Sequence, residues 1–238
     1  MSLWNKIIKS ISGAENHSVM PISRDTSRFA FIDVEVGVKD HKIHDIGVVR
    51  WDGAILHTGD KWKLFDFLEG VDFICGHNII HHDVKYLFGE DSHKWMLVDT
   101  LYLSPLLFPE RPYHRLLKDD KLMSEQMNNP VNDCEKAQDL LMDEVARWNM
   151  LSEERKIIFA TLLQGIPEFD GFLSFVKAKS EKTNNLTNLI RSAYYGKICE
   201  HADVESILVN FPCELSYALS LVDTTDYRSI TPPWVLRN

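Results

Sequence analysis

Two acidic residues, Asp33 and Glu35, interrupt an otherwise apolar run over residues 29–36 that is rich in β-branched and aromatic side chains. If this run is a strand, the two acids point to the same face of the sheet. Two carboxylates on one face repel each other and lose hydration, so one is driven towards its neutral form unless a cation binds between them. A hard divalent ion that prefers oxygen ligands is the usual solution. The alternative is an edge strand with a solvated polar face.

A third acid, Asp83, follows an expected strand over residues 72–78 that contains Gly76-His77-Asn78. Apolar residues then repeat with helical spacing over residues 80–88, so Asp83 is expected just inside a helix that starts after a strand. The N-terminus of a helix favours an acid, and capping explains this residue when it is taken alone.

A fourth acid, Asp133, lies in the opening turn of the clearest expected helix, over residues 132–148. Glu135 and Asp139 are less well supported neighbours. Capping again explains Asp133 alone. The order and context of the four acids, more than any one of them, favour a shared site.

The elements that position these acids indicate an α/β or α+β protein, because strands alternate with helices after an initial meander. Expected strands cover residues 29–36, 45–51, 54–58, 72–78 and 95–100, of which the first three form the antiparallel meander. Expected helices cover residues 64–68, 80–88, 132–148, 153–163, 169–179 and 186–195, and short elements follow over 204–210 and 212–221.

The chain is expected to divide into three parts. Residues 1–27 form a tail or short helix, residues 28–150 form a mixed α/β domain, and residues 151–238 form a mostly helical extension or connector. A hydrophobic content of 45% in 238 residues is enough for a sizeable core.

Composition narrows the protein class. No stretch approaches the roughly 18 apolar residues of a membrane span, and no secretory signal is recognisable, so no membrane partner and a cytoplasmic location are expected. The cysteines are far apart and expected to be reduced and mostly buried; they are Cys75, Cys134, Cys199 and Cys213.

A formal charge of −9 argues against nucleic acid as a partner. In a metallonuclease, however, bound ions neutralise the acids of the site, and a local basic strip is enough to hold the phosphates. Two such strips occur over residues 111–121 and 177–197; the alternative is an ordinary solvated surface.

The chain resembles the DEDD (DnaQ-like) superfamily of 3′→5′ exonucleases, and most closely its DEDDh branch, in an ordered set of motifs. These are Phe31-Ile-Asp-Val-Glu, Asp45-Ile-Gly, Gly76-His-Asn with Asp83-Val-Lys-Tyr-Leu, Val98-Asp-Thr-Leu, and Asn132-Asp-Cys-Glu-Lys-Ala-Gln-Asp-Leu-Leu. The resemblance covers roughly residues 28–150. It implies a ribonuclease H-like fold with a mixed five-stranded sheet flanked by helices, plus a helical C-terminal extension.

The resemblance also implies a catalytic site with two Mg²⁺ or Mn²⁺ ions about 4 Å apart. Asp33, Glu35 and Asp133 are then expected as direct ligands, with Asp83 acting largely through water.

Four further residues are expected to contact the substrate. His77 and Asn78 are expected beside the nucleotide, and Arg115 and Lys118 are expected to contact phosphates.

The chain departs from the family pattern at the general base. The family has a histidine five residues, or a tyrosine four residues, before the last aspartate, whereas this chain has Asn128 and Asn129. Asparagine accepts no proton at neutral pH, and general-base assistance is worth roughly 10²- to 10⁴-fold in rate. Three alternatives stay open: His114, Lys118 or Lys121 substitutes, the attacking water ionises unaided, or activity is lost and the domain only binds.

A second resemblance covers residues 202–236, which look like the connector between an N-terminal DEDD domain and a RecQ-type ATP-dependent DNA helicase in some bacterial proteins. It implies that this chain is the N-terminal piece of such a helicase and that the substrate is DNA.

Three hypotheses follow. The first is an exonuclease that releases nucleoside monophosphates from DNA 3′ ends, with Leu56, Phe73 or Tyr86 as stacking candidates for the terminal base. The second is a module that binds nucleic acid and orients a helicase, with Tyr194-Tyr195 as a stacking platform. The third is a protein-interaction domain that inherited the fold.

Overall fold

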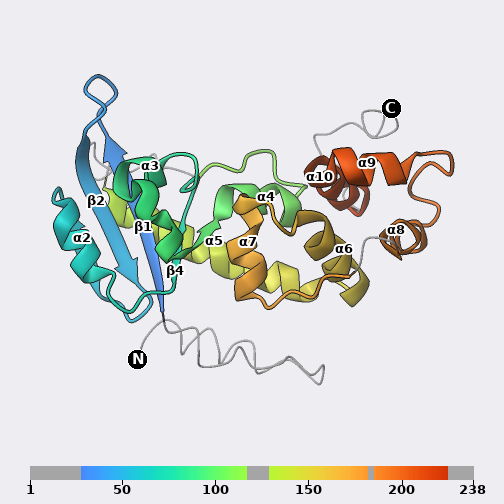
Figure 1. Cartoon of the computed structure of the whole chain (residues 1–238), viewed down its shortest axis with the longest axis horizontal. Coiled ribbons are helices and arrows are strands. Elements are labelled where there is room, and N and C mark those ends of the chain that lie inside the picture. Colours follow the sequence, from blue (N-terminus) through green and yellow to red (C-terminus); the bar gives the residue numbers. More distant parts are fainter. Residues whose placement is uncertain (1–27, 117–128, 182–184, 225–238) are drawn as a thin grey trace.

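A mixed five-stranded sheet organises the N-terminal half of the chain (Figure 1), and the computed structural model describes residues 28–116, 129–181 and 185–224. The strands are β1 (Phe29–Val36), β2 (Ile43–Arg50), β3 (Ile55–Thr58), β4 (Phe73–Gly76) and β5 (Met96–Asp99). Their order across the sheet is β3-β2-β1-β4-β5. The first three are antiparallel, while β1, β4 and β5 are parallel, so the predicted meander and mixed sheet are confirmed.

Strand β1 is central and divides its side chains between two cores. Phe29 and Phe31 belong to one hydrophobic cluster, while Ala30, Ile32 and Val34 belong to the other. Because side chains alternate along a strand, Asp33 and Glu35 continue the row of Phe29 and Phe31. The alternative of a solvated edge strand is therefore wrong, since β1 has a neighbour on each side.

One face of the sheet is covered by α2 (Lys61–Phe67) and α3 (Asp83–Leu87), and the 3₁₀-helix η1 (Gly89–Lys94) follows α3 and contacts it. Helix α2 begins three residues earlier than expected because the Asp60 carboxylate accepts a hydrogen bond from the Trp62 amide and caps it. Helix α3 is shorter than the expected helix over residues 80–88, because turns occupy the residues before Asp83.

The other face is covered by α5 (Pro130–Met150), with α4 (Thr100–Leu107) and α7 (Pro167–Phe175) beside it. Helix α7 lies directly against β5: a Cβ atom at Gly171 would lie 1.9 Å from the carbonyl oxygen of Leu97. Only glycine permits this contact.

The C-terminal helices continue the core on the α5 side and lie at the opposite end of the molecule from α2 (Figure 1). They are α6 (Glu153–Leu163), α8 (Leu186–Ala193), α9 (Val204–Asn210) and α10 (Pro212–Val222). Helix α10 is fixed to α4, since the Tyr217 hydroxyl donates to the Tyr102 carbonyl at 3.0 Å. One hydrophobic cluster runs from Phe29 to Leu219, so the predicted boundary near residue 150 falls between two helices of a shared core.

All four cysteines are free, as expected; Cys75 and Cys134 are buried, but Cys199 is exposed. Tyr194 is also buried, so the predicted pair of stacking tyrosines is wrong for that residue, and only Tyr195 is exposed. Among the described residues, no helix has the length and apolar character needed to cross a membrane.

Candidate metal centre

Three carboxylates converge where β1 meets the first turn of α5. Asp33, Glu35 and Asp133 each offer a carboxylate oxygen, and these oxygens lie within 4.8 Å of one another. Oxygen donors in this number suit Mg²⁺ or Mn²⁺, which prefer hard ligands. The chemistry of the donors therefore fits the ions that the motifs imply, and the sequence prediction of these three residues agrees with their placement.

Gly47 on β2 allows α5 to approach. It is paired with Asp33 in the sheet. A Cβ atom there would lie 2.4 Å from the carbonyl carbon of Pro130 and 2.5 Å from the amide nitrogen of Val131. The first turn of α5 therefore rests on the backbone of β2, and this contact brings Asp133 to the acids of β1.

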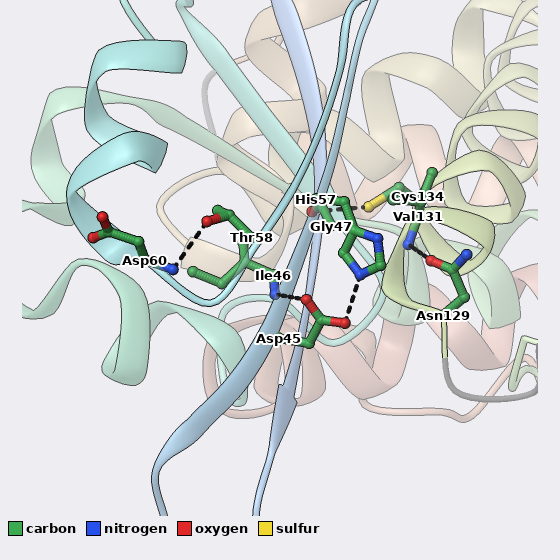
Figure 2. A network of polar contacts seen from close by, with 9 residues as sticks. All are labelled: Asp45, Ile46, Gly47, His57, Thr58, Asp60, Asn129, Val131 and Cys134. Atoms are coloured by element: carbon green, nitrogen blue, oxygen red, sulfur yellow. Dashed lines mark hydrogen bonds and ion pairs between the residues drawn. The ribbon is translucent and has the colours of Figure 1, made fainter. Parts of the chain in front are cut away.

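Two hydrogen bonds hold this turn in place (Figure 2). The thiol of Cys134 donates to the carbonyl oxygen of Gly47 at 3.1 Å, and the Asn129 side chain accepts from the Val131 amide at 3.0 Å. Asn129 is thus the N-cap of α5. The side-chain oxygen of Asn129 thus caps the helix that carries Asp133.

Replacing Gly47 with alanine is expected to separate α5 from β2. The added methyl group overlaps helix backbone, which cannot rotate away, so we expect a loss of about 1–3 kcal/mol in the free energy of unfolding. Asp133 moves from Asp33 at the same time, so Mn²⁺ affinity measured by calorimetry falls as well. Gly59→Ala is the control, because a Cβ there approaches only the carbonyl oxygen of His44, at 3.3 Å. Unchanged Mn²⁺ affinity in Gly47→Ala would contradict this role.

The fourth predicted acid, Asp83, is buried beside the cluster and outside the group of three. It is the first residue of α3 and is 2% exposed. Its carboxylate accepts from the amide of Val34 at 3.2 Å and lies 3.3 Å from Nδ1 of His82. Burial raises its pKa, while His82 and the Val34 amide oppose the rise.

Asp33 is surrounded by other acids. Its pKa is raised to about 8, first by burial and then by the neighbouring charges of Asp83, Asp133 and Glu35. Lys136 lies 3.3 Å from Asp133 and offsets part of this charge. A divalent cation would relieve the remaining repulsion, because it favours the ionised form of every acid around it.

Asp99 organises the loop beside the site, a role that the motif Val98-Asp-Thr-Leu hinted at without defining. Its buried carboxylate accepts from the amides of Asn78 at 2.8 Å, Ile80 at 3.2 Å and Leu101 at 3.0 Å. These bonds cap α4 and hold Asn78 in a left-handed conformation with φ of 67°. The signal in the sequence is an acid directly after a buried strand, where a helix cap belongs.

The structure describes three of the four predicted substrate residues, which are His77, Asn78 and Arg115. His77 Nδ1 is hydrogen-bonded to the Thr100 hydroxyl at 2.9 Å, and burial lowers its pKa to about 4, so it is neutral at pH 7. For Asn78, the bond to Asp99 is made by the backbone amide. Arg115 is exposed in the segment after α4, while Lys118 lies outside the described residues.

Of the general-base candidates His114, Lys118 and Lys121, only His114 lies within the described residues. His114 Nδ1 is hydrogen-bonded to Ser104 Oγ at 2.9 Å, and burial lowers its pKa. Lys121 and Asn128 lie outside the described residues, as do residues 1–27, which were expected to form a tail or short helix.

A further buried acid, Glu144, lies farther along α5. It is fully buried, and neither carboxylate oxygen has a hydrogen-bond partner among the residues the structure describes. Burial, followed by the nearby charge of Asp99, raises its pKa well above its usual value. Burial of Glu144 inside the core therefore favours the neutral form of this acid.

Comparison with protein-family models, with curated proteins and with solved structures finds no match to the chain.

Proposed function

We propose that the chain is a divalent-metal-dependent 3′→5′ exonuclease of the DEDD type, releasing nucleoside monophosphates from DNA 3′ ends. The observation that carries the proposal is the convergence of Asp33, Glu35 and Asp133, whose carboxylate oxygens lie within 4.8 Å of one another. Asp33 and Glu35 lie about a hundred residues before Asp133 in the chain, and all three lie next to residues of the hydrophobic core. Three acids brought together in this way repel one another, so their convergence favours a functional role over a structural one.

The sheet supports the same proposal. Its order, with β1 antiparallel to β2 and parallel to β4, is compatible with the ribonuclease H-like fold that the motifs imply. The site lies beside the central strand, in the part of the sheet where antiparallel and parallel pairing meet.

Asp33, Glu35 and Asp133 would hold two Mg²⁺ or Mn²⁺ ions, and Asp83 would act through water. Such ions, when bound, stabilise the charge that develops on the attacking and leaving oxygens of a phosphodiester. The protein residues position the substrate: we assign phosphate contacts to Arg115 and Lys118.

His77 and Asn78 are assigned to the edge of the nucleotide pocket. The loop that carries them is fixed by Asp99 and Thr100, so its shape is set before the substrate binds. DNA as the substrate rests on the resemblance of residues 202–236 to a helicase connector.

A second candidate function is a module that binds nucleic acid and orients an attached helicase without cleaving. The cap geometry of α5 favours it, because the Asn129 side chain is bonded to Val131 and takes no part in proton transfer. His114 Nδ1 is hydrogen-bonded to Ser104 Oγ. The exonuclease proposal therefore needs a proton acceptor other than Asn129. The alternatives are His114 through its Nε2, Lys118 or Lys121, or an attacking water that ionises unaided.

Single DNA strands labelled at either end test the proposal. With Mn²⁺ or Mg²⁺, we expect a 3′ label to be released as a mononucleotide and a 5′-labelled strand to shorten in single-nucleotide steps, with no reaction in EDTA. Strand binding without release under either metal would replace the exonuclease with the binding module. Absence of both binding and release would favour an interaction domain.

A further inference from the structure

We propose that a strip of aromatic and lysine side chains, leading from the carboxylates across α3 to α2, binds the single strand of nucleic acid behind its 3′ end. The strip consists of His82, Tyr86, Lys85, Lys61, Trp62 and Lys94. The assignment of the 3′ end to the carboxylates rests on the proposed function, whereas binding of a strand does not.

The strip begins at the site itself. His82 Nδ1 lies 3.3 Å from the buried Asp83, and the histidine side chain is 46% exposed. The ring centroids of His82 and Tyr86 are 5.8 Å apart. Residues four apart share one side of a helical turn, so α3 presents both rings in a row that leaves the site.

Helix α2 continues the row. The ammonium group of Lys61 donates to the carbonyl oxygen of Tyr86 at 3.2 Å, which joins α2 to α3. Lys85 places its ammonium 4.8 Å from the centroid of the Tyr86 ring. The next residue of α2, Trp62, is 78% exposed, an unusual place for the largest apolar side chain.

The row ends in a hollow of about 310 Å³ lined by Lys61, Trp62, Phe65, Asp91 and Lys94. Lys94 forms an ion pair with Asp91 at 2.8 Å, so the acid offsets one of the two lysines of the hollow. The hollow thus keeps a net positive charge, in a chain whose formal charge is −9.

This pattern matches a single strand better than a protein partner. Bases stack on exposed aromatic rings whatever their sequence, and lysines between the rings meet the phosphates. The centres of protein interfaces are depleted in lysine, whereas here Lys61 and Lys85 lie against Tyr86. The strip also leads to the acids, as a path for a chain end requires.

Strand binding by the Trp62→Ala variant tests the inference. In protein carrying Asp33→Asn to block cleavage, we expect fluorescence anisotropy to show about tenfold weaker binding of an oligonucleotide of about 12 nucleotides. Removing the charge of Lys61 and Lys94 by glutamine is expected to make the binding constant less sensitive to salt. When the logarithm of the binding constant is plotted against the logarithm of salt concentration, the slope should become less steep by about 0.7 for each phosphate that a lysine no longer neutralises.

Tyr195→Ala is the comparison variant, because Tyr195 is 85% exposed shortly after α8 and is the rival candidate for stacking on a base. Helix α8 lies at the opposite end of the molecule from α2 (Figure 1). Equal affinity of Trp62→Ala and its parent, or equally weakened binding in Tyr195→Ala, would overturn the strip. If Trp62-dependent binding occurs in a protein that never cleaves, the strip stands and the exonuclease proposal fails. If the protein cleaves DNA but its affinity for the strand does not depend on Trp62, the exonuclease proposal stands and the strip is overturned.

Discussion

Replacing Asp33 with asparagine is expected to abolish metal-dependent cleavage and, in the same molecule, to stabilise the metal-free fold. Loss of a ligand removes several kcal/mol of transition-state stabilisation, so we expect the rate to fall by at least about 10³-fold. The stability gain has an electrostatic origin, because burial and three neighbouring acids raise the pKa of Asp33 to about 8.

The sign of the pH dependence follows from that shift. In the folded protein Asp33 keeps its proton up to about pH 8, whereas in the unfolded chain it loses the proton near its ordinary pKa of 3.8. The folded state is therefore penalised as pH rises through this window, and the penalty is absent below it. After discounting for solvent screening, we expect Asp33→Asn to gain about 2 kcal/mol at neutral pH.

Urea unfolding in EDTA at about pH 4 and about pH 8 measures the effect, which should appear only at the higher pH. Asp143→Asn removes a carboxylate from the same helix as Asp133, but its side chain is 67% exposed, so it should change neither stability nor rate. Metal should stabilise the parent by about 2.7 kcal/mol at a hundred times its dissociation constant, and leave Asp33→Asn unchanged. A destabilised Asp33→Asn at pH 8 would refute the strained cluster.

Glu144→Leu is expected to produce the second large effect, a more stable protein. The carboxyl group is fully buried without a partner in the described part of the chain, so its removal relieves a desolvation penalty of about 1–3 kcal/mol. Because burial raises its pKa, the folded state keeps a proton that the unfolded state releases as pH rises. Wild-type stability therefore falls by about 1.4 kcal/mol per pH unit above the unfolded pKa, until the folded pKa is reached.

A comparison of Glu144→Leu with Glu144→Gln separates the cost of burying an unpaired polar group from the cost that arises when the carboxyl group titrates. Both variants should lose this part of the pH dependence in urea titrations, but leucine should give the higher stability, because glutamine leaves an unpaired amide in the core. Asp143→Asn again serves as the neighbouring control. A wild-type protein whose stability exceeds that of both variants at about pH 8 would show that Glu144 has a partner that stabilises its charge.

Local sequence patterns were sufficient to place the acids on their elements. Alternation along residues 29–36 put Asp33 and Glu35 on one face, and the structure bears this out for β1. Helical periodicity put Asp133 in the first turn of a helix, which α5 confirms. These features depend on neighbouring residues, which a sequence displays directly.

Contacts between distant residues were harder to predict. Helix α4 was not expected, because Pro105 lies inside it and the capping role of Asp99 depends on bonds to Asn78 and Ile80. The steric role of Gly47 was equally hidden, since it arises from the Pro130 backbone more than eighty residues away.

Because side chains alternate along β1, the same register of this strand forms both hydrophobic cores and places Asp33 and Glu35 at the site. Shifting β1 by one residue would turn Asp33 and Glu35 into the apolar layer beneath α2 and bring Val34 out to α5. Such a molecule would bury two charges and lose one of its cores. Substitution can therefore remove the acids, whereas a one-residue shift of β1 is disfavoured because it would exchange the residues of the two cores.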